Sequence, residues 1–458
     1  MSSRRQFISG AVKVAGATGG WALLASCAPT AAPGEATQVP AAEQEAPAGE
    51  APKAAGEGPV YMRWLTDHYG GLRGQLSDEA LERYKEMHPD VEIVYEPVPE
   101  VAERLMVSFA AGVEPDIMLF SDDLMIPYGH RVLDLTPFYD ADPEISREDY
   151  MLVPALFLKD NKDWCVPFQG NIQGMWINED LFKEAGVPMP WEYDHAGDKW
   201  WDWNDFLVTC QAIRQLPPRE GMDIYGMMLA NRFEWGYLSW VLSNGGNYAD
   251  VEQGVSTFSS EPTKEAMKFV VDLFCEYDVA MPFEQIEVTR TSLGVRPFNA
   301  GLAGCAELTN EGQVRASELN CYRVAFPRSP RTGEAHTGLN NQPHVIAAGT
   351  PFPQEAFDFI KFMGSREIQW RAYELGCFDA CRIDIYEDPE HYSDWPAISK
   401  EAIVEQIREG GYRPMFNSFW EWVSDFHSIM EEVCACDLSF EEGIAELDAV
   451  TNAVLQAH

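Results

Sequence analysis

The acidic side chains of this chain do not form a recognisable catalytic pair. Asp122 and Asp123 stand together after a predicted strand. A glycoside hydrolase needs two carboxylates at a fixed separation across a cleft, whereas neighbours on an extended chain point to opposite sides of it. The motifs G-x-S-x-G, H-E-x-x-H, G-x-x-x-x-G-K-[ST] and G-x-G-x-x-G are also missing beyond the N-terminal region. We therefore expect a protein that is not an enzyme, with a secreted acidic glycoside hydrolase as the alternative.

The histidines and cysteines give no metal or redox signature. The nine histidines show no ligand spacing, so a surface or packing role explains each of them better. Among the ten cysteines, the close pairs Cys377/Cys381 and Cys434/Cys436 are poorly spaced for zinc. Buried free thiols are the favoured interpretation, and a Cys377–Cys381 disulfide is the alternative. We expect no metal and no cofactor.

A polar strand between two apolar ones is the stretch most suggestive of ligand binding. Residues 164–188 read WCVPFQGNIQGMWINEDLFKEAGVP, with Gln169 and Asn171 among the polar residues. Asn178 is predicted to cap a short helix that Gly186 ends. Such a polar strand is costly to bury, and it suits a chain that crosses an open cleft with its amides facing a polar ligand. An ordinary strand–turn–helix is an equally good interpretation of this stretch alone.

Composition narrows the class of partner. The chain has 458 residues, of which 46% are hydrophobic, and this predicts two or three domains with a large core. The net charge of −40 makes nucleic acid an unsuitable partner and disfavours an anionic membrane surface without a covalent anchor. The 14 tryptophans suit core packing, and they also suit stacking on sugar faces.

The first folded region follows a doubly wound α/β pattern, in which strands and helices alternate. Ser77 is predicted to cap the first helix, and Gly112 to end the second. Ligands of such sheets bind beyond the carboxyl ends of the strands. That places the loops 67–69 and 122–123 on one rim, although Asp and Gly also suit solvated turns. The predicted strands are residues 60–65, 91–95 and 115–120, with the second helix at 101–111.

The N-terminus resembles an export signal. Arg4-Arg5 precede an apolar run, as in twin-arginine signals, and Leu24-Ala25-Ser26-Cys27 resembles a lipobox in which Cys27 is acylated. A simple transmembrane anchor is the alternative. Residues 28–58 are rich in Ala, Pro, Glu and Gly and are predicted to be a disordered tether. Nine cysteines then remain, so at least one is unpaired or pairs outside the chain.

Several motifs together resemble family 1 extracellular solute-binding proteins, the substrate-capturing subunits of ATP-driven importers. The motifs are the MWINEDLFKEAGVP stretch and residues 81–95, 111–117, 132–138 and 298–306, in the order found in that family. The resemblance implies two α/β lobes of the periplasmic-binding-protein type, joined by three crossing segments and closing on ligand by a hinge motion. Residues 302–305 depart from the family pattern, and residues 191–203 form a Trp-rich insert that the family lacks. Both features argue against assigning the ligand site of any one family member to this chain.

The resemblance also implies partners and a location. The solute is expected to be a carbohydrate, the commonest cargo of the family, although a cationic ligand suits aromatic and acidic residues as well. The protein is expected to act as a monomer, anchored through lipid on Cys27 at the extracytoplasmic face of the cell membrane, and to deliver solute to the permease subunits of an ABC transporter. A lipoprotein that presents ligand to a sensor is the other alternative.

The domain prediction follows from the same order of motifs. It comprises a signal at 1–27, a tether at 28–58, lobe 1 at 59–169 plus 328–378, and lobe 2 at 170–327 plus 379–458.

Candidate ligand contacts come from the two strand-end loops, the crossing strand and positions that match the family pattern. Trp235 matches an aromatic residue that the family carries near a helix start and that contacts ligand. A role as a core tryptophan explains this residue equally well. Asn340 and Asn341 either bind hydroxyls or cap a turn. The predicted contacts are Trp64, Asp67, His68, Asp122, Asp123, Gln169, Asn171, Trp235, Asn310, Glu311, Asn340, Asn341 and Trp420.

Overall fold

The computed structural model describes residues 59–457, apart from Tyr69, Tyr392, Asp394 and the segments 152–161, 196–199, 230–234 and 309–318. The predicted export signal, Cys27 and the tether therefore lie outside the described residues. The described residues all belong to one contact unit of the chain, Pro52–His458. Across this part of the chain, no helix combines the length and the apolar character needed to cross a bilayer.

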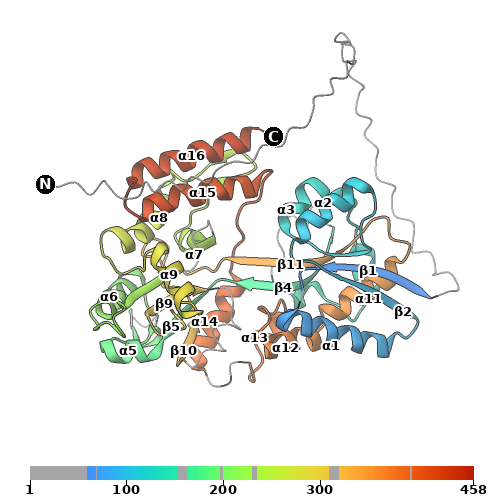
Figure 1. Cartoon of the computed structure of the whole chain (residues 1–458), viewed down its shortest axis with the longest axis horizontal. Coiled ribbons are helices and arrows are strands. Elements are labelled where there is room, and N and C mark those ends of the chain that lie inside the picture. The colour runs from blue at the N-terminus through green and yellow to red at the C-terminus, as the bar shows by residue number, and fades with distance from the viewer. Residues whose placement is uncertain are drawn as a thin grey trace, which may run out of the picture. The chain divides into compact units, whose positions relative to one another are not determined.

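Strands and helices alternate through most of the chain (Figure 1). The strands are β1 Val60–Thr66, β2 Val91–Pro97, β3 Ile117–Leu119, β4 Val166–Ile172, β5 Gly174–Asn178, β6 Tyr225–Leu229, β7 Ala249–Asp250, β8 Val255–Ser256, β9 Ala303–Leu308, β10 Cys321–Val324 and β11 Leu339–Ile346. The helices are α1 Gly71–Met87, α2 Val101–Ala111, α3 Asp122–Tyr128, α4 Thr136–Ala141, α5 Glu179–Ala185, α6 Trp203–Arg214, α7 Trp235–Ser243, α8 Glu261–Cys275, α9 Phe283–Leu293, α11 Pro353–Met363, α12 Arg366–Leu375, α13 Ile383–Tyr386, α14 Ala397–Arg408, α15 Phe419–Cys434 and α16 Phe440–Gln456.

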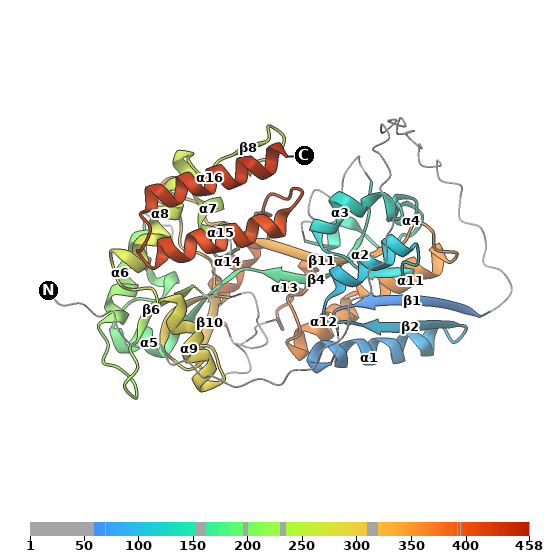
Figure 2. The ribbon, with the colours of Figure 1, turned by 45° about the horizontal axis from the view of Figure 1, so that its top comes forward.

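The first sheet has the order β2-β1-β3-β11-β4, with β1 parallel to both β2 and β3. Side chains alternate between its faces, so Trp64 enters one hydrophobic cluster and Leu65 the other. Helix α1 lies along the β1–β2 pair in Figure 2 and packs in the cluster that holds Trp64. A sheet covered on both faces is the doubly wound architecture predicted from the sequence.

The second sheet has the order β10-β5-β9-β6 and packs in a separate hydrophobic cluster. Helices α15 and α16 lie side by side and contribute to this cluster (Figures 1 and 2). The predicted start of α5 is confirmed, because Asn178 accepts from the backbone N–H groups of its first turn. Asp202 does the same for α6. Gly186 ends α5 in the left-handed conformation, as predicted.

Three stretches of chain connect the two sheets and their clusters. Only Gln173 separates β4 of the first sheet from β5 of the second, which confirms that the polar strand crosses between them. The chain returns from β10 to β11 through residues 325–338, and crosses again through α14 and residues 409–418. Residues around Ala335 pack with the second cluster, and Tyr386 packs with the first. The lobe boundaries at 327/328 and 378/379 stay a prediction.

A fully buried ion pair spans the β4–β5 crossing. Arg323 of β10 donates through Nη1 to Asp379 Oδ1 at 2.9 Å, and the two side chains are 3% and 0% exposed. Both residues also hold the crossing backbone: Ile172 N donates to Asp379 Oδ2 at 2.8 Å, and Arg323 Nη2 donates to Ile172 O at 2.8 Å. A Cβ atom on Gly170 would lie 2.6 Å from the carbonyl oxygen of Asp379, so only glycine fits there.

Two local predictions near the first sheet are corrected. Helix α1 begins at Gly71 rather than at Ser77, which lies buried inside the helix and pairs with His68. Asp122 and Asp123 form the start of α3 rather than a loop. Ser77 suits a helix cap but makes a tertiary contact instead. Asp122 and Asp123 suit a turn but form the first turn of a helix instead.

The prediction of buried free thiols holds for six of the described cysteines and is wrong for Cys275 and Cys436, and the alternative pairing is also wrong. Cys377 and Cys381 are both free and buried, so they form no disulfide. The disulfide joins Cys275, at the end of α8, to Cys436, which follows α15, across a sequence separation of 161. No local spacing could indicate a pair so far apart. Of the seven free cysteines in the described residues, only Cys321 is not buried.

We predict that Asp379→Asn costs about 3–5 kcal/mol of unfolding free energy, because it removes the carboxylate charge that pairs with the buried Arg323 guanidinium. Urea unfolding of the full chain measures this. The exposed pair between Glu287 and Arg290 supplies the control, since Glu287→Gln should cost less than about 1 kcal/mol. Equal losses in the two variants would show that the ion pair does not hold the crossing.

Candidate functional site

Arg413 lies among three aromatic rings, of which Trp235 and Phe419 belong to the second cluster. Its guanidinium carbon is 4.6 Å from the ring centre of Phe419, 5.2 Å from that of Trp420 and 5.8 Å from that of Trp235. These are cation–π distances. Trp420 remains 54% exposed, whereas Trp235 is 7% exposed. One face of an exposed indole is therefore available beside a buried guanidinium.

The same guanidinium reaches an acid of the first sheet. Arg413 Nη2 is 3.6 Å from Oδ1 of Asp122, and the two side chains are 7% and 3% exposed. Asp122 stands directly after β3 at the first residue of α3, so the pair joins the strand-end rim of one sheet to helices of the other. Leu339 N donates to Gly411 O at 2.8 Å, and this holds the chain before Arg413 against the start of β11.

A row of amide side chains lies on β4 and β11, the two strands that follow β3 in the order of the first sheet. The strands are antiparallel, with Gln169 opposite Gln342 and Asn171 opposite Asn340. Residues two apart on a strand share a face, so these four amides line one face of the strand pair. Gln169 Nε2 donates to Gln342 Oε1 at 2.5 Å. Asn171 and Asn340 are half-buried, and their amides can bind the hydroxyl groups of a polar ligand.

A buried histidine fixes the orientation of these amides. His68 Nε2 lies 3.2 Å from Gln169 Oε1, and its Nδ1 lies 2.9 Å from Ser77 Oγ. A carbonyl oxygen only accepts, so Nε2 carries the proton and Nδ1 accepts from Ser77. The Gln169 amide then donates to Gln342 Oε1. Burial lowers the pKa of His68 to about 4, so this imidazole is neutral at pH 7.

Gln173, the residue between β4 and β5, positions the start of α7. Its Nε2 donates to Trp235 O at 2.5 Å, and its Oε1 accepts from Ser239 Oγ at 2.7 Å. Its backbone oxygen accepts from Thr337 Oγ1. The crossing strand therefore sets the position of Trp235 through side-chain contacts.

The structure brings together part of the predicted set. Asp122, Trp235 and Trp420 meet at Arg413, and Gln169, Asn171 and Asn340 lie on the amide row. Asp67 lies beside His68, where it accepts from Arg73 Nη1 at 2.9 Å. Asn310 and Glu311 lie outside the described residues, as does the side chain of Asp123.

Three of the predicted contacts have almost no exposed surface, and their contact with a ligand stays a prediction. Trp64 is 0% exposed and packs in the core, where its Nε1 donates to His344 Nε2. His68 is 0% exposed and orients Gln169. Asn341 is 1% exposed and stands opposite Gly170 on the inner face of the strand pair.

Sequence reasoning missed Arg413, Gln342 and the positioning role of Gln173. A weak signal was present for the first, since Arg413 is the only basic residue in a stretch rich in aromatic residues, YRPMFNSFWEW. No sequence signal pairs it with Asp122, which is far away along the chain.

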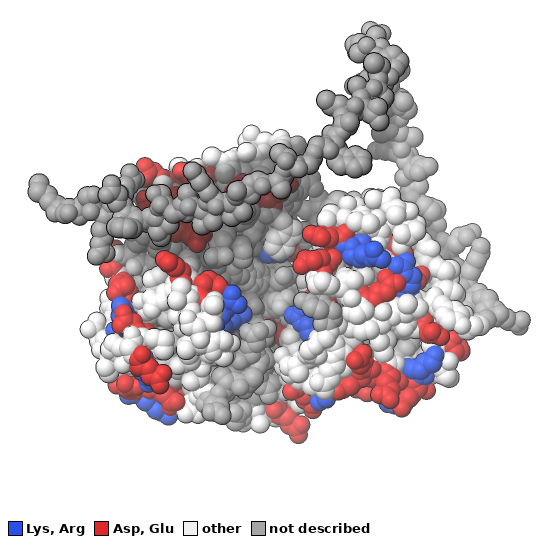
Figure 3. All heavy atoms as spheres, viewed as in Figure 1, with Lys and Arg blue, Asp and Glu red and all other residues white. Residues whose placement is uncertain are grey.

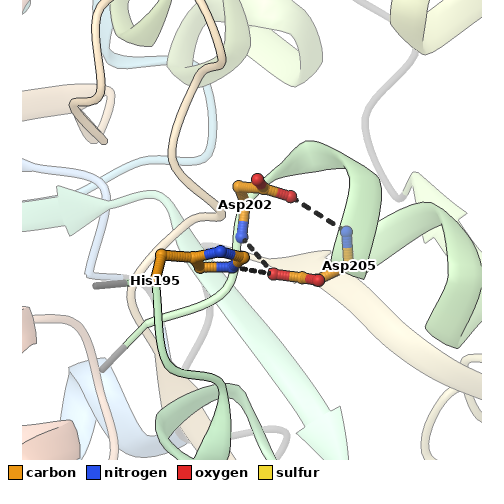
Figure 4. A group of neighbouring side chains, drawn as sticks. All are labelled: His195, Asp202 and Asp205. Atoms are coloured by element: carbon orange, nitrogen blue, oxygen red, sulfur yellow. Dashed lines mark hydrogen bonds and ion pairs between the residues drawn. The ribbon is translucent and has the colours of Figure 1, made fainter. Parts of the chain in front are cut away.

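A second group of side chains has the composition of a metal site but serves another purpose. His195, Asp202 and Asp205 place ligand atoms within 4.8 Å of one another. Figure 4 shows Asp205 accepting from His195 and from the backbone of Asp202, while Asp202 accepts from the backbone of Asp205. This is a reciprocal capping box at the start of α6. The carboxylates are engaged in starting the helix, which accounts for their proximity.

Comparison with known proteins places the chain in a family. Residues 69–370 match the model for bacterial extracellular solute-binding proteins. The chain belongs to this family. The match covers more than half of the chain and includes α3, β4, β5 and α7. The family is one of solute-binding proteins and not of enzymes, so the glycoside hydrolase alternative is set aside.

Solved structures share the fold at low sequence identity. A sugar-binding protein, MalE, from Xanthomonas citri aligns with a TM-score of 0.73 at 16% identity, covering 87% of this chain and 98% of that one. Maltose-bound MalE3 from T. maritima aligns with a TM-score of 0.67 at 20% identity, covering 86% and 99%. A maltotriose-binding protein of Pyrococcus abyssi is 27% identical over 150 residues, which are 30% of this chain and 33% of that one. The predicted two-lobed α/β fold is thereby confirmed.

We predict that His68 makes the protein acid-sensitive. Its pKa is about 4 when folded against an ordinary 6.5, so the unfolded chain binds the proton more readily. The stability that neutral His68 provides is complete above pH 6.5 and is lost as the pH falls towards 4. Urea unfolding at pH 7 and about pH 4 should show a difference in unfolding free energy that His68→Gln reduces by about 3 kcal/mol. The same substitution at the exposed His130 should leave the difference unchanged, and an equal change in both variants would refute the assignment.

Proposed function

We propose that this protein captures a carbohydrate at the Arg413 site and delivers it to an ABC importer. The observation that carries the proposal is the exposed ring of Trp420 beside the Arg413–Asp122 pair. A sugar presents an apolar C–H face that stacks on an aromatic ring, and hydroxyls that bind planar charged or amide groups. The site offers both kinds of surface side by side.

The amide row extends the same chemistry. Asn171 and Asn340 stand opposite each other with partly exposed amides, and each amide both donates and accepts. A hydroxyl also does both, so a row of neutral amides suits a neutral polyol better than an ion. The sugar-binding functions of several proteins with the same fold support this choice of solute.

The test is thermal unfolding of the full chain with a panel of monosaccharides, malto-oligosaccharides, amino acids and polyamines. A ligand at about a hundred times its Kd should stabilise the fold by roughly 2.7 kcal/mol. Stabilisation by one sugar class, without consumption of that sugar, is the expected result. Stabilisation by amino acids or polyamines alone would agree with a solute-binding fold but would refute carbohydrate as the solute.

We predict that Trp420→Ala weakens binding of the sugar found in that panel by about ten-fold, which corresponds to about 1.4 kcal/mol of lost stacking. Isothermal titration measures this. Trp370→Ala is the matched control, because Trp370 is a partly exposed tryptophan of α12 that also carries a guanidinium, that of Arg366, over its ring. Its affinity should equal that of the unmodified protein. Unchanged affinity of the Trp420→Ala variant would show that the Trp420 ring does not contact the sugar.

The proposal includes anchoring at the extracytoplasmic face of the membrane through lipid on Cys27. It is supported by the lipobox-like sequence at residues 24–27, by the twin-arginine pattern before it and by the tether-like composition of residues 28–58. An anchored receptor with a long tether can meet its permease without diffusing away from the cell.

We predict that Cys27→Ala moves the protein from the membrane fraction to the soluble extracytoplasmic fraction, because the acyl chains provide the membrane affinity. Fractionation followed by mass determination of the N-terminal peptide measures both location and acylation. Cys321→Ala, which removes a thiol of the folded region, serves as the control and should remain membrane-bound. Retention of the Cys27→Ala protein in the membrane would favour a transmembrane anchor instead.

A further inference from the structure

A second hollow, apart from the Arg413 site, lies along α14. It has a volume of about 600 Å³, and its lining includes Trp200, Ala325 and Ile398. None of the residues of the Arg413 site or the amide row lines it. It is therefore a separate concave surface with its own apolar wall.

One edge of this hollow carries three carboxylates in a row. Glu401, Glu405 and Glu409 line it at four-residue spacing along or just beyond α14, so successive side chains are about 6 Å apart. Like charges at this spacing repel each other. All three are exposed, and no ion pair of these carboxylates occurs within the described residues. Two further charged residues of the lining, Arg328 and Glu334, offset each other and leave this excess of negative charge in place.

The hollow also contains an amide with an unused donor. Gln406 lines it and is 6% exposed. Its Oε1 accepts from the backbone N–H of Phe326 at 3.1 Å, which fixes the direction of the side chain. The Nε2 group at the other end is buried, and no acceptor for it lies among the described residues. A buried N–H group without an acceptor costs about 1–3 kcal/mol, so a ligand oxygen at this point would be stabilised.

The spacing of the acids favours an organic cation over a metal ion. In the part of the chain that the structure describes, only His195, Asp202 and Asp205 bring three ligand atoms within 4.8 Å of one another. The three carboxylates of α14 therefore do not come close enough together to hold one metal ion among them. An ammonium group beside the acids, with its carbon skeleton against Trp200 and Ile398, matches the surface better.

We propose that this hollow binds a small organic cation that also carries a hydrogen-bond acceptor, of the amino-sugar or amino-alcohol class. The ammonium group lies between the α14 carboxylates, the carbon skeleton contacts the apolar wall, and a hydroxyl oxygen accepts from Gln406. The inference goes beyond carbohydrate capture at the Arg413 site and does not depend on it.

Isothermal titration of the full chain with glucosamine tests this, with N-acetylglucosamine as the neutral counterpart and spermidine as a cation without an oxygen acceptor. We expect glucosamine to bind, and the double variant Glu405→Gln, Glu409→Gln to weaken that binding by about ten-fold. Both residues are exposed, so these variants should fold. Glu446→Gln, at an exposed position of α16, is the matched control and should bind as the unmodified protein does.

The Trp420→Ala variant separates this hollow from the Arg413 site. Glucosamine binding that survives Trp420→Ala and is lost in the double variant supports the proposal. Binding that is lost in Trp420→Ala and survives in the double variant places the amine at the Arg413 site and overturns the proposal. Equal binding of N-acetylglucosamine would overturn the role of charge, and tighter binding of spermidine would overturn the role of the acceptor. Absence of binding by all three compounds would overturn the hollow as a site.

Discussion

The buried ion pair between Arg323 and Asp379 is the constraint on which the arrangement of the site depends. It joins β10 of the second sheet to the chain beside β4 of the first, and both partners bind the backbone of Ile172. On β4 the amide row ends at Asn171, just before Ile172, and Gln173 follows. A charge pair removed from water needs nearly ideal geometry to be tolerated, so the crossing has little freedom exactly where it presents its amides. Figure 3 shows acidic side chains spread over the described surface, where water and salt screen them, in contrast to this buried pair.

Local structure around the site was largely predictable from the sequence, because its causes are local. Asn178 and Gly186 delimit α5 through contacts with their own helix, and the alternating pattern of β1 gives its two buried faces. The polar crossing strand was recognised because burying amides without a ligand or partner is costly. Those inferences needed only a few neighbouring residues each.

Contacts between distant parts of the chain were not predictable in the same way. The placement of Ser77 inside α1 depends on His68 and Gln169, and the buried position of Trp64 depends on which face of β1 it occupies. Arg413 meets Asp122 only because residues 409–418 return to the start of β11. Composition and periodicity describe faces and ends of elements, and they do not say which end meets which.

The distribution of thiols has a consequence for oxidative folding. A chain with many cysteines that matures in an oxidising compartment risks pairing the wrong partners. Six of the seven free cysteines in the described residues are buried, including Cys434, which stands two positions before the disulfide partner Cys436. Burial raises the pKa of the Cys434 thiol to about 12, which suppresses the thiolate needed for disulfide exchange. In the folded protein, burial of the nearby free thiols therefore protects the Cys275–Cys436 disulfide from exchange. The free thiols need no disulfide partners of their own for this protection.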